Sequence, residues 1–282
     1  MPIMKRIAGL REIADQFDLF LVDQYGVLHD GVAAYPGAID GLARIRSRGR
    51  KVVVLTNSGK DMAANLSRLG ALGFAGSGFD AVVSSGDVAL QCIRNGARGP
   101  PFARGADICV IGRRGDTYAF SSDDFRLVNR PQDAAFLVFA GSDAPWTSLD
   151  TYRSVLTAAA QAHVPAICIN PDVTMIRDGE LVPAPGTIAR IYESLRGRVE
   201  YVGKPYSAIF NHAVATAAVG PDARVVMIGD SPEHDVAGAK AIGLSTLLVR
   251  TGIHHHLPEQ KLLRFCDGCG GVPDFLMTAF EW

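Results

Sequence analysis

Short apolar runs alternate with helical patterns along most of this 282-residue chain. The runs are rich in β-branched and other apolar side chains and end in Gly or polar residues, as buried parallel strands do. Strands are predicted over 19–22, 52–56, 81–84, 108–111, 136–140, 166–169, 199–202, 225–228 and 246–249. Helices are predicted over 38–48, 61–72, 148–162, 187–195, 208–218 and 235–241. This alternation predicts an α/β protein with parallel strands, and nine strands are many for a single sheet.

Composition and charge narrow the class of partner. With 48% hydrophobic and 20% charged residues, the chain has enough apolar material for one large core or two modest ones. The 28 Lys and Arg residues nearly balance the 29 Asp and Glu residues, and no block of like charge occurs. A broad surface for nucleic acid or for an anionic membrane is therefore not expected, and a small molecule is the predicted partner.

The apolar segments predict a soluble, cytoplasmic protein. Residues 1–17 contain acidic side chains and lack the uninterrupted apolar stretch of a signal peptide. Runs such as 134–140 are far shorter than the roughly 20 residues that a membrane-spanning helix needs.

The cysteines do not predict a disulfide framework, because they are odd in number and scattered along the chain. They are Cys92, Cys109, Cys168, Cys266 and Cys269. The last two form a CxxC whose only nearby candidate co-ligands for zinc are His254–His256, at a spacing that fits no usual zinc site. A plain C-terminal turn for the CxxC and a solvated loop for the histidines are the predictions.

The chemistry-bearing motifs fall at both ends of the chain and leave the middle without any. The interval 86–188 has its own alternation of strands and helices and is long enough to hold its own core. We therefore predict a core built from 1–85 and 189–282, with an inserted α/β domain at 86–188. The small residues and prolines of 84–86 and 183–186 are predicted hinges.

Asp23 is the first candidate for chemistry. It directly follows the apolar run 19–22 and precedes a Gly-containing turn. In an open α/β sheet this carboxyl end of a strand is where ligands bind. An acid there can act as a nucleophile or bind a metal, although the same position also suits a capping Asp.

Two further strand ends could bind an anion. The run 52–56 ends in Thr56, Asn57 and Ser58 before a predicted helix, where hydroxyl, amide and backbone N–H groups suit a phosphate. Simple helix capping would explain the same residues. Lys204 follows the run 199–202 and could neutralise a phosphate, or could be an exposed turn residue.

Carboxylates cluster after the strand predicted at 225–228. Asp230 comes just after it, with Glu233 and Asp235 in the following turn. Such a cluster is costly through mutual repulsion unless a cation relieves it, and hard oxygen ligands suit Mg²⁺.

The order of these elements resembles the four motifs of the haloacid dehalogenase (HAD) superfamily. The intervening 86–188 resembles the large α/β cap of its NagD-like and pyridoxal-phosphatase-like class, subclass IIA. Asn170-Pro171-Asp172 is similar to the loop that this cap places near substrate, and Thr251-Gly252 is similar to a common ending of the core. The resemblance implies a Rossmann-like, doubly wound parallel sheet with an inserted α/β cap domain.

The resemblance also implies roles for single residues. Asp23 would be the nucleophile that forms an aspartyl-phosphate, and Lys204 would balance the phosphoryl charge. Substrate and phosphate would be bound by Thr56, Asn57, Ser58, Lys204, Asn170 and Asp172. Mg²⁺ would be held by Asp23, the backbone carbonyl of Tyr25, Asp230 and Asp235.

Tyr25 departs from the family pattern. The usual first motif is Asp-x-Asp, in which the second Asp protonates the leaving group and then activates water, and Tyr25 stands in its place. A tyrosine, with an ordinary pKa of about 10, is a better donor than base near neutral pH. His29, Asp30 and Asp172 are the other candidate donors.

The predicted function is Mg²⁺-dependent hydrolysis of a small phosphorylated metabolite. Two alternatives remain: a weakened enzyme that binds a phosphometabolite and regulates, or another aspartate-nucleophile reaction such as phosphotransfer or dehalogenation. The resemblance to capped phosphatases suggests a homodimer. Arg113-Arg114 suits either an acidic substrate or an ordinary surface, and the latter is the prediction.

Overall fold

The computed structural model describes residues 4–74, 78–121 and 123–282. These residues form two compact units. The first lies within Met1–Thr56, Ala63–Val83 and Lys204–Trp282, and the second within Asn57–Met62 and Ser84–Gly203. The interval 86–188, predicted as an inserted domain, falls inside the second unit.

The first unit contains a seven-stranded sheet with the order β1-β14-β13-β12-β2-β3-β4. Its strands are β1 (Lys5–Arg6), β2 (Leu19–Asp23), β3 (Lys51–Thr56), β4 (Ala81–Ser84), β12 (Val225–Gly229), β13 (Ser245–Val249) and β14 (Phe275–Met277). The pairings of β2 with β3 and β12, of β13 with β12 and β14, and of β1 with β14 are parallel. Strand order reverses beside β2, since β3 lies on one side of it and the much later β12 on the other.

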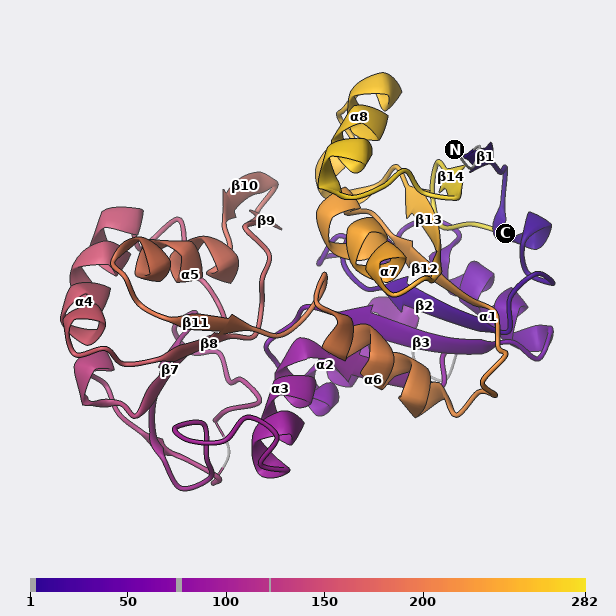
Figure 1. Cartoon of the computed structure of the whole chain (residues 1–282). Helices are drawn as coiled ribbons and strands as arrows, with labels where there is room; N and C mark the ends of the chain where they lie inside the picture. The colour runs from indigo at the N-terminus through magenta and orange to yellow at the C-terminus, as the bar shows by residue number, and fades with distance from the viewer. Residues whose placement is uncertain (1–3, 75–77, 122) are drawn as a thin grey trace. The chain divides into compact units, whose positions relative to one another are not determined.

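Helices cover both faces of this sheet, with α6 and α7 on one face and α1 on the other (Figure 1). The helices are α1 (Ala38–Ser47), α2 (Met62–Leu69), α6 (Ser207–Ala217), α7 (Ala237–Ala241) and α8 (Glu259–Cys269). Short 3-10 segments occur at Leu10–Glu12 and Gly252–His254, and π turns at Gly70–Phe74 and Pro232–Val236. The central strands β2 and β12 are buried along their whole length because both faces of the sheet are covered.

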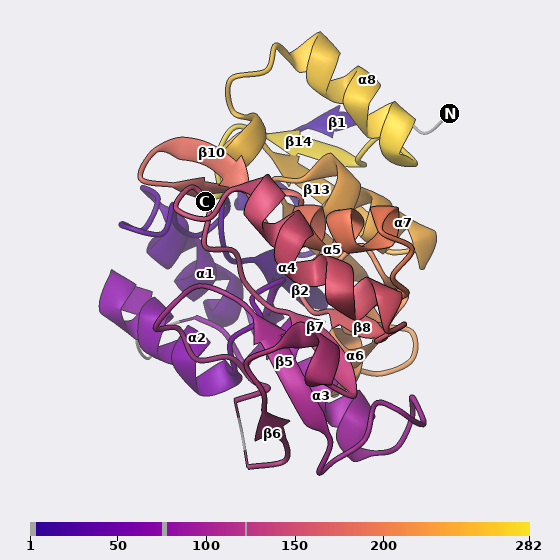
Figure 2. The ribbon, with the colours of Figure 1, turned by 90° about the vertical axis from the view of Figure 1, so that its left-hand side faces the viewer.

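The second unit contains a five-stranded parallel sheet with the order β11-β8-β7-β5-β6 and a separate hairpin. The strands are β5 (Asp107–Ile111), β6 (Arg126–Leu127), β7 (Phe136–Phe139), β8 (Ala166–Cys168) and β11 (Val199–Tyr201), with β9 (Thr174–Arg177) and β10 (Glu180–Pro183) in the hairpin. The helices are α3 (Ser85–Arg94), α4 (Leu149–Gln161) and α5 (Pro185–Ser194), with a 3-10 turn at Pro131–Asp133. Helices α4 and α5 lie side by side in front of β7 and β8 (Figure 2), and their apolar faces form a core with those strands.

The structure confirms the α/β class with parallel sheets. Each of the nine predicted strands is present, with ends within one residue of those predicted. None of the helices in the described parts of the chain has the length and hydropathy that crossing a membrane requires.

The boundary between the two units falls between Val83 and Ser84, at the edge of the hinge predicted at 84–86. Helix α3 begins there, and the Oγ of Ser84 caps it by accepting the backbone N–H of Asp87 at 3.1 Å. Two local predictions were wrong. The predicted hinge at 183–186 runs into α5, which begins at Pro185, a favoured first helical residue. The predicted C-terminal turn at Cys266 and Cys269 is instead the last turn of α8.

Candidate active site

Strand β2 delivers Asp23 to the carboxyl edge of the first sheet. All five residues of β2 are buried, and Asp23 itself is only 8% exposed. Its Oδ1 accepts the backbone N–H of Gln24 at 2.7 Å, which fixes the carboxylate where the strand ends. Because strand order reverses between β2 and β12, Asp23 lies at the crevice where open α/β sheets bind ligands.

The neighbouring strand β12 delivers Asp230, and the following π turn delivers Asp235. The Oδ2 of Asp230 accepts the backbone N–H of Ile253 at 3.0 Å. The Oδ2 of Asp235 accepts the backbone N–H of Ser231 at 3.0 Å. Backbone donors therefore orient both carboxylates, whose residues are 5% and 0% exposed.

Two glycines make room for Asp230. Gly26 and Gly252 have φ of +83° and +70°, and a Cβ at either would collide with the carboxylate of Asp230. The Oγ1 of Thr251 donates a hydrogen bond to the carbonyl of Gly26, which ties the loop after β13 to the loop after β2. Both loops are thus held against the carboxylate by close backbone packing.

Lys204 joins two of the acids. Its Nζ lies 2.6 Å from Oδ1 of Asp23 and 2.7 Å from Oδ1 of Asp235, and its side chain is 3% exposed. Carboxylate oxygens of Asp23, Asp230 and Asp235 all lie within 4.8 Å of one another. One buried ammonium therefore faces three buried carboxyl groups.

The pKa values in this cluster are shifted because three buried carboxyl groups face a single ammonium. Burial, together with the charge of Asp235, raises the pKa of Asp23 to about 7 against the opposing effect of Lys204. Burial and the charges of Asp23 and Asp235 raise the pKa of Asp230 well above its ordinary value. Burial alone would lower the pKa of Lys204, but the carboxylates of Asp23 and Asp235 outweigh it and raise that pKa.

The cluster fits a divalent cation bound by oxygen. Three carboxyl groups and one ammonium leave two negative charges in a dry place when all are ionised, and a bound cation would remove this cost. Hard oxygen donors are what Mg²⁺ and Ca²⁺ prefer. Among residues 4–74, 78–121 and 123–282, this is the only group of three or more acidic, His or Cys side chains close enough to share an ion.

The other predicted site residues divide between the two units. Thr56 ends β3 in the first unit and is 3% exposed. In the second unit, the Nδ2 of Asn57 donates to Oδ1 of Asp172 at 2.8 Å, and the Oδ1 of Asn170 accepts the backbone N–H of Asp172 at 3.1 Å. The carbonyl of Ser58 accepts a hydrogen bond from the Oγ of Ser85 at 3.1 Å. Asn57, Asn170 and Asp172 therefore form one connected group in that unit.

Tyr25 is partly exposed and packs against its own loop. The residue is 42% exposed, and its ring contacts the ring of His29 edge-on with 4.4 Å between centroids. The guanidinium carbon of Arg68 on α2 lies 5.8 Å from the centroid of the tyrosine ring. At the position where the family pattern has an acid, this chain therefore has the aromatic ring of Tyr25, held by contacts with His29 and Arg68.

Two of the alternative proton donors are unsuited to the role. His29 is fully buried, its Nδ1 accepts the backbone N–H of Gly31 at 2.9 Å, and its Nε2 lies 3.1 Å from the amide nitrogen of Gln24. Burial and the charge of Arg68 lower the pKa of His29 to about 4, so the ring is neutral at pH 7.

Asp30 is committed to its own turn. Its Oδ1 accepts the backbone N–H groups of Val32 and Ala33, each at 2.8 Å. These hydrogen bonds lower the pKa of Asp30, which is therefore ionised near neutral pH and has no proton to give.

Some residues at this edge carried no sequence signal. Tyr35 is half-buried, and its pKa is raised by burial and by the charge of Asp230 while a hydrogen bond from the backbone of Gly252 opposes the shift. His254 was predicted in a solvated loop, yet it is half-buried, with Nε2 3.4 Å from Oε2 of Glu233 and its ring against Phe265. These contacts bridge segments far apart in the chain, which no local pattern reports.

The prediction of a solvated loop holds for His255 and His256, which are exposed. All five cysteines are free, which agrees with the absence of a predicted disulfide framework.

Known hydrolases are similar to this chain over most of its length. Residues 20–126 match the haloacid dehalogenase-like hydrolase family model, and residues 201–264 match a HAD-hydrolase-like model. Chronophin from Mus musculus is 30% identical over 262 residues, which cover 88% of this chain and 86% of chronophin. D-glycerol 3-phosphate phosphatase from Mycobacterium tuberculosis is 28% identical over 249 residues, covering 87% of this chain and 66% of that protein.

A solved structure agrees over nearly the whole chain. The haloacid dehalogenase-like hydrolase from Brucella suis has a TM-score of 0.81 and 28% identity, and the match covers 97% of this chain and 99% of that one. With the carboxylate cluster and its lysine at the reversal of strand order, these likenesses show that the chain belongs to the haloacid dehalogenase superfamily of hydrolases, in subclass IIA.

Proposed function

We propose that this protein is a Mg²⁺-dependent phosphatase that hydrolyses a small phosphorylated metabolite through an aspartyl-phosphate on Asp23. The observation that carries the proposal is Lys204, buried between Asp23 and Asp235 at hydrogen-bond distance from both. An ammonium held there lowers the charge that a phosphoryl group would meet at Asp23.

In the proposed reaction, a carboxylate oxygen of Asp23 attacks phosphorus while the bond from phosphorus to the ester oxygen breaks. The leaving oxygen takes up a proton, and water then attacks the aspartyl-phosphate, which releases inorganic phosphate and restores Asp23. Lys204 balances the charge on the phosphoryl oxygens. Thr56, Asn57 and Ser58 are the proposed phosphate ligands, and Asn170 and Asp172 the proposed substrate contacts.

The proposed metal site consists of Asp23, Asp230, the backbone carbonyl of Tyr25 and Asp235. Backbone N–H groups orient the carboxylates of Asp230 and Asp235 at this site. Bound there, Mg²⁺ would supply positive charge to the transferring phosphoryl group.

Tyr25 is the proposed proton donor to the leaving group. His29 and Asp30 are excluded by their hydrogen bonds and by pKa values that leave the first neutral and the second ionised. Because a phenol is a weak acid, donation is slow, and substrates whose leaving groups need little protonation should react best.

The substrate class follows from the relatives and from the charge of the chain. A related protein is named as a D-glycerol 3-phosphate phosphatase, and we propose a phosphate ester of similar small size here. We also propose that residues 86–188 form an inserted domain. The protein is further proposed to be a homodimer and to be located in the cytoplasm.

The test is release of inorganic phosphate from 4-nitrophenyl phosphate and from a panel of phosphorylated metabolites, with and without Mg²⁺. The native protein is compared with Asp23→Asn and with Asp222→Asn, an exposed control in the same unit. Mg²⁺-dependent turnover that Asp23→Asn abolishes and Asp222→Asn keeps is expected.

Other outcomes assign the site differently. Saturable binding of a metabolite without turnover would show a phosphometabolite-binding protein. Transfer of the phosphoryl group to an acceptor other than water would show phosphotransfer, and halide release from a haloacid without Mg²⁺ would show dehalogenation.

A further inference from the structure

The sheet of the second unit has its own reversal of strand order. From β5 the chain adds β6 on one side, and then places β7, β8 and β11 in turn on the other. The loops that follow β5 and β7 therefore diverge from one crevice at the carboxyl edge, which is the position where open parallel sheets bind small ligands. Nothing in the proposed phosphatase chemistry uses this crevice.

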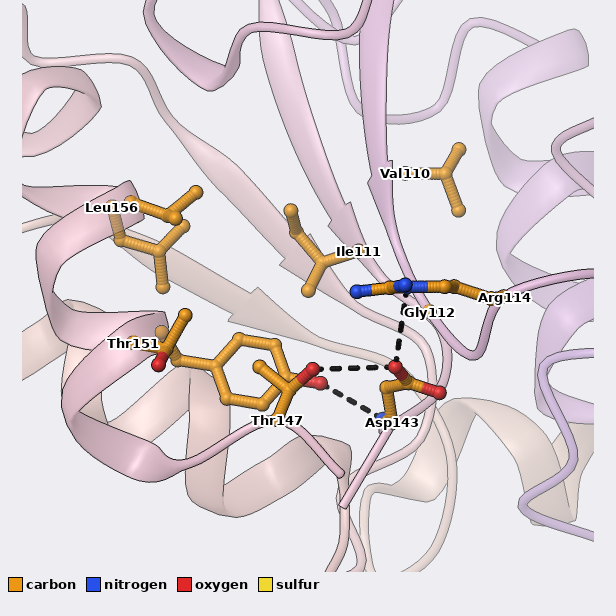
Figure 3. A pocket seen from close by; sticks show the side chains of 10 residues that line it. Val110, Ile111, Gly112, Arg114, Asp143, Thr147, Thr151 and Leu156 are labelled. Carbon is orange, nitrogen blue, oxygen red and sulfur yellow. Dashed lines mark hydrogen bonds and ion pairs between the residues drawn. The ribbon is translucent and has the colours of Figure 1, made fainter. Parts of the chain in front are cut away.

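A pocket of about 180 Å³ lies there, lined by the end of β5, the loop after β7 and the first turns of α4 (Figure 3). Ile111, Val155 and Leu156 give it an apolar wall, and Arg114, Asp143 and Thr147 give it a polar one. At roughly 30 Å³ per water molecule, the space suits a small metabolite and is too small for a nucleotide.

Asp143 is a buried carboxylate with few partners. The residue is 9% exposed, and its Oδ2 accepts a hydrogen bond from the Oγ1 of Thr147 at 3.2 Å. The Nε of Arg114 lies 3.6 Å from the same oxygen, which is too far for a hydrogen bond. The backbone N–H of Asp143 donates a hydrogen bond to the hydroxyl of Tyr152 at 2.8 Å. The carboxylate therefore has one hydrogen bond and a loose ion pair, and a cationic donor in the pocket would give it a charged hydrogen bond.

Arg114 is free to serve a second group. Its side chain is 90% exposed, and at 3.6 Å it gains little from Asp143, because exposed ion pairs contribute at most about 1 kcal/mol. Figure 3 shows the guanidinium of Arg114 beside the carboxylate of Asp143, with a dashed line that marks their ion pair. Because the side chain of Arg114 is exposed, it can turn away from Asp143 at small cost and admit a ligand.

We propose that this pocket binds an α-amino acid with an aliphatic side chain. The ligand's ammonium pairs with Asp143 and its carboxylate with Arg114, while its side chain lies on Ile111, Val155 and Leu156. A simple anion is disfavoured because it would meet the carboxylate of Asp143, and a simple amine would leave Arg114 unused. One cation and one anion a few ångströms apart beside an apolar wall match the two charges and the apolar tail of this ligand class.

The test is isothermal titration calorimetry on the full chain at neutral pH with three ligands of one skeleton: leucine, 3-methylbutylamine and 4-methylpentanoate. Leucine should bind about 10- to 100-fold more tightly than either one-ended analogue, since it makes one further charged hydrogen bond. The readout is binding alone, so it does not depend on whether the protein is a phosphatase.

Three variants locate the site. Asp143→Asn keeps the shape and should abolish the preference for leucine over 4-methylpentanoate, while Arg114→Gln should weaken leucine without affecting 3-methylbutylamine. Val155→Phe, at a residue that is 48% exposed and so tolerant of change, should fill the pocket and block all three. Arg130→Gln, at an exposed arginine elsewhere in the unit, is the matched control and should bind as the native protein does. The proposal is overturned if leucine binds no better than its analogues, if no aliphatic amino acid binds at millimolar concentration, or if Val155→Phe still binds leucine.

Discussion

The two units share one topological feature, a reversal of strand order in a parallel sheet, but differ in the charged side chains found there. Each has a parallel sheet whose strand order reverses once, beside β2 in the first unit and between β5 and β7 in the second. In each, a buried Asp follows the strand at that point: Asp23 in the first unit and Asp143 in the second. The first edge adds two more buried acids and one buried lysine, whereas the second adds a single exposed arginine.

The difference shows which property comes from topology and which from side chains. The reversal of strand order creates a crevice in both units. An excess of buried acid then makes the first crevice suited to a metal and a phosphoryl group, and a balanced pair suits the second to a zwitterion. Changes in the charged residues should therefore have large effects at the first edge and small ones at the second.

The largest expected effect comes from restoring an acid at the first edge. Tyr25→Asp should raise the rate for alkyl phosphates, whose leaving groups need a proton, by about 10²- to 10⁴-fold. It should change the rate for 4-nitrophenyl phosphate little, because that leaving group departs as an anion. Rates plotted against leaving-group pKa for the two proteins give the measurement.

Tyr25→Phe is the matched control for that change. It keeps the ring against His29 and Arg68 but removes the hydroxyl. If alkyl phosphates react as fast with Phe as with Tyr, Tyr25 is not the proton donor.

The next effect in size is on stability and compares the two edges directly. Lys204→Met leaves Asp23 and Asp235 buried without their cation, and this should cost about 3–5 kcal/mol of unfolding free energy in the absence of Mg²⁺. Arg114→Gln cuts the corresponding pair of the second unit, which is exposed, and should cost at most about 1 kcal/mol. Urea unfolding measures both, and equal losses would contradict the contrast between the edges.

The sequence predicted the parts of the fold that rest on continuous apolar runs. Strands β2, β3 and β12 are buried on both faces, so their patterns are unambiguous, and the acids that follow them necessarily meet at one edge. The hairpin of β9 and β10 was not predicted, because its strands are half-exposed and lack such a run. Helix α3 was not predicted, because the small residues Ser84 and Gly86 indicated only a hinge, whereas Ser84 also caps a helix.

The site was predictable as a set of residue types but not as a network. The proximity of Asp23, Asp230 and Asp235 follows from strand order, and the link through Lys204 depends on a side-chain conformation that no pattern gives. The contact of Tyr25 with His29 likewise depends on a loop that folds back on itself. The sequence therefore predicts which residues lie at the sheet edge, but not the side-chain contacts that depend on the conformation of the loops.

His29 gives the first unit a dependence of stability on pH. Its pKa in the folded protein is about 4, below the ordinary value of 6.5, so between these values the unfolded chain binds more protons than the folded one. His29 alone should accordingly lower the unfolding free energy by up to about 3 kcal/mol as the pH drops from 6.5 to 4, while Asp23, whose pKa is raised to about 7, contributes in the opposite direction.

The measurement is urea unfolding across this pH range. The unfolding free energy of the native protein minus that of His29→Asn isolates this contribution and should fall by up to about 3 kcal/mol between pH 6.5 and 4. The same difference for His163→Asn, at an exposed histidine of the second unit, should stay constant. A difference between the native protein and His29→Asn that does not change with pH would show that the pKa of His29 is not lowered in the fold.

The smallest expected effect on stability comes from replacing one glycine in each unit, where the two glycines differ in backbone conformation. Gly179 turns the β9–β10 hairpin with φ +82° after Asp178 at φ +52°, and Gly268 lies within α8 with no positive φ. A methyl group at either position would meet no atom within 4 Å, so only backbone conformation distinguishes them. Gly179→Ala should destabilise by about 1–2 kcal/mol, because alanine is strained in the left-handed region. Gly268→Ala should stabilise by up to about 1 kcal/mol, because alanine favours a helix. Thermal unfolding gives both signs, and a Gly179→Ala protein as stable as the native one would mean that the hairpin turn does not hold this conformation in solution.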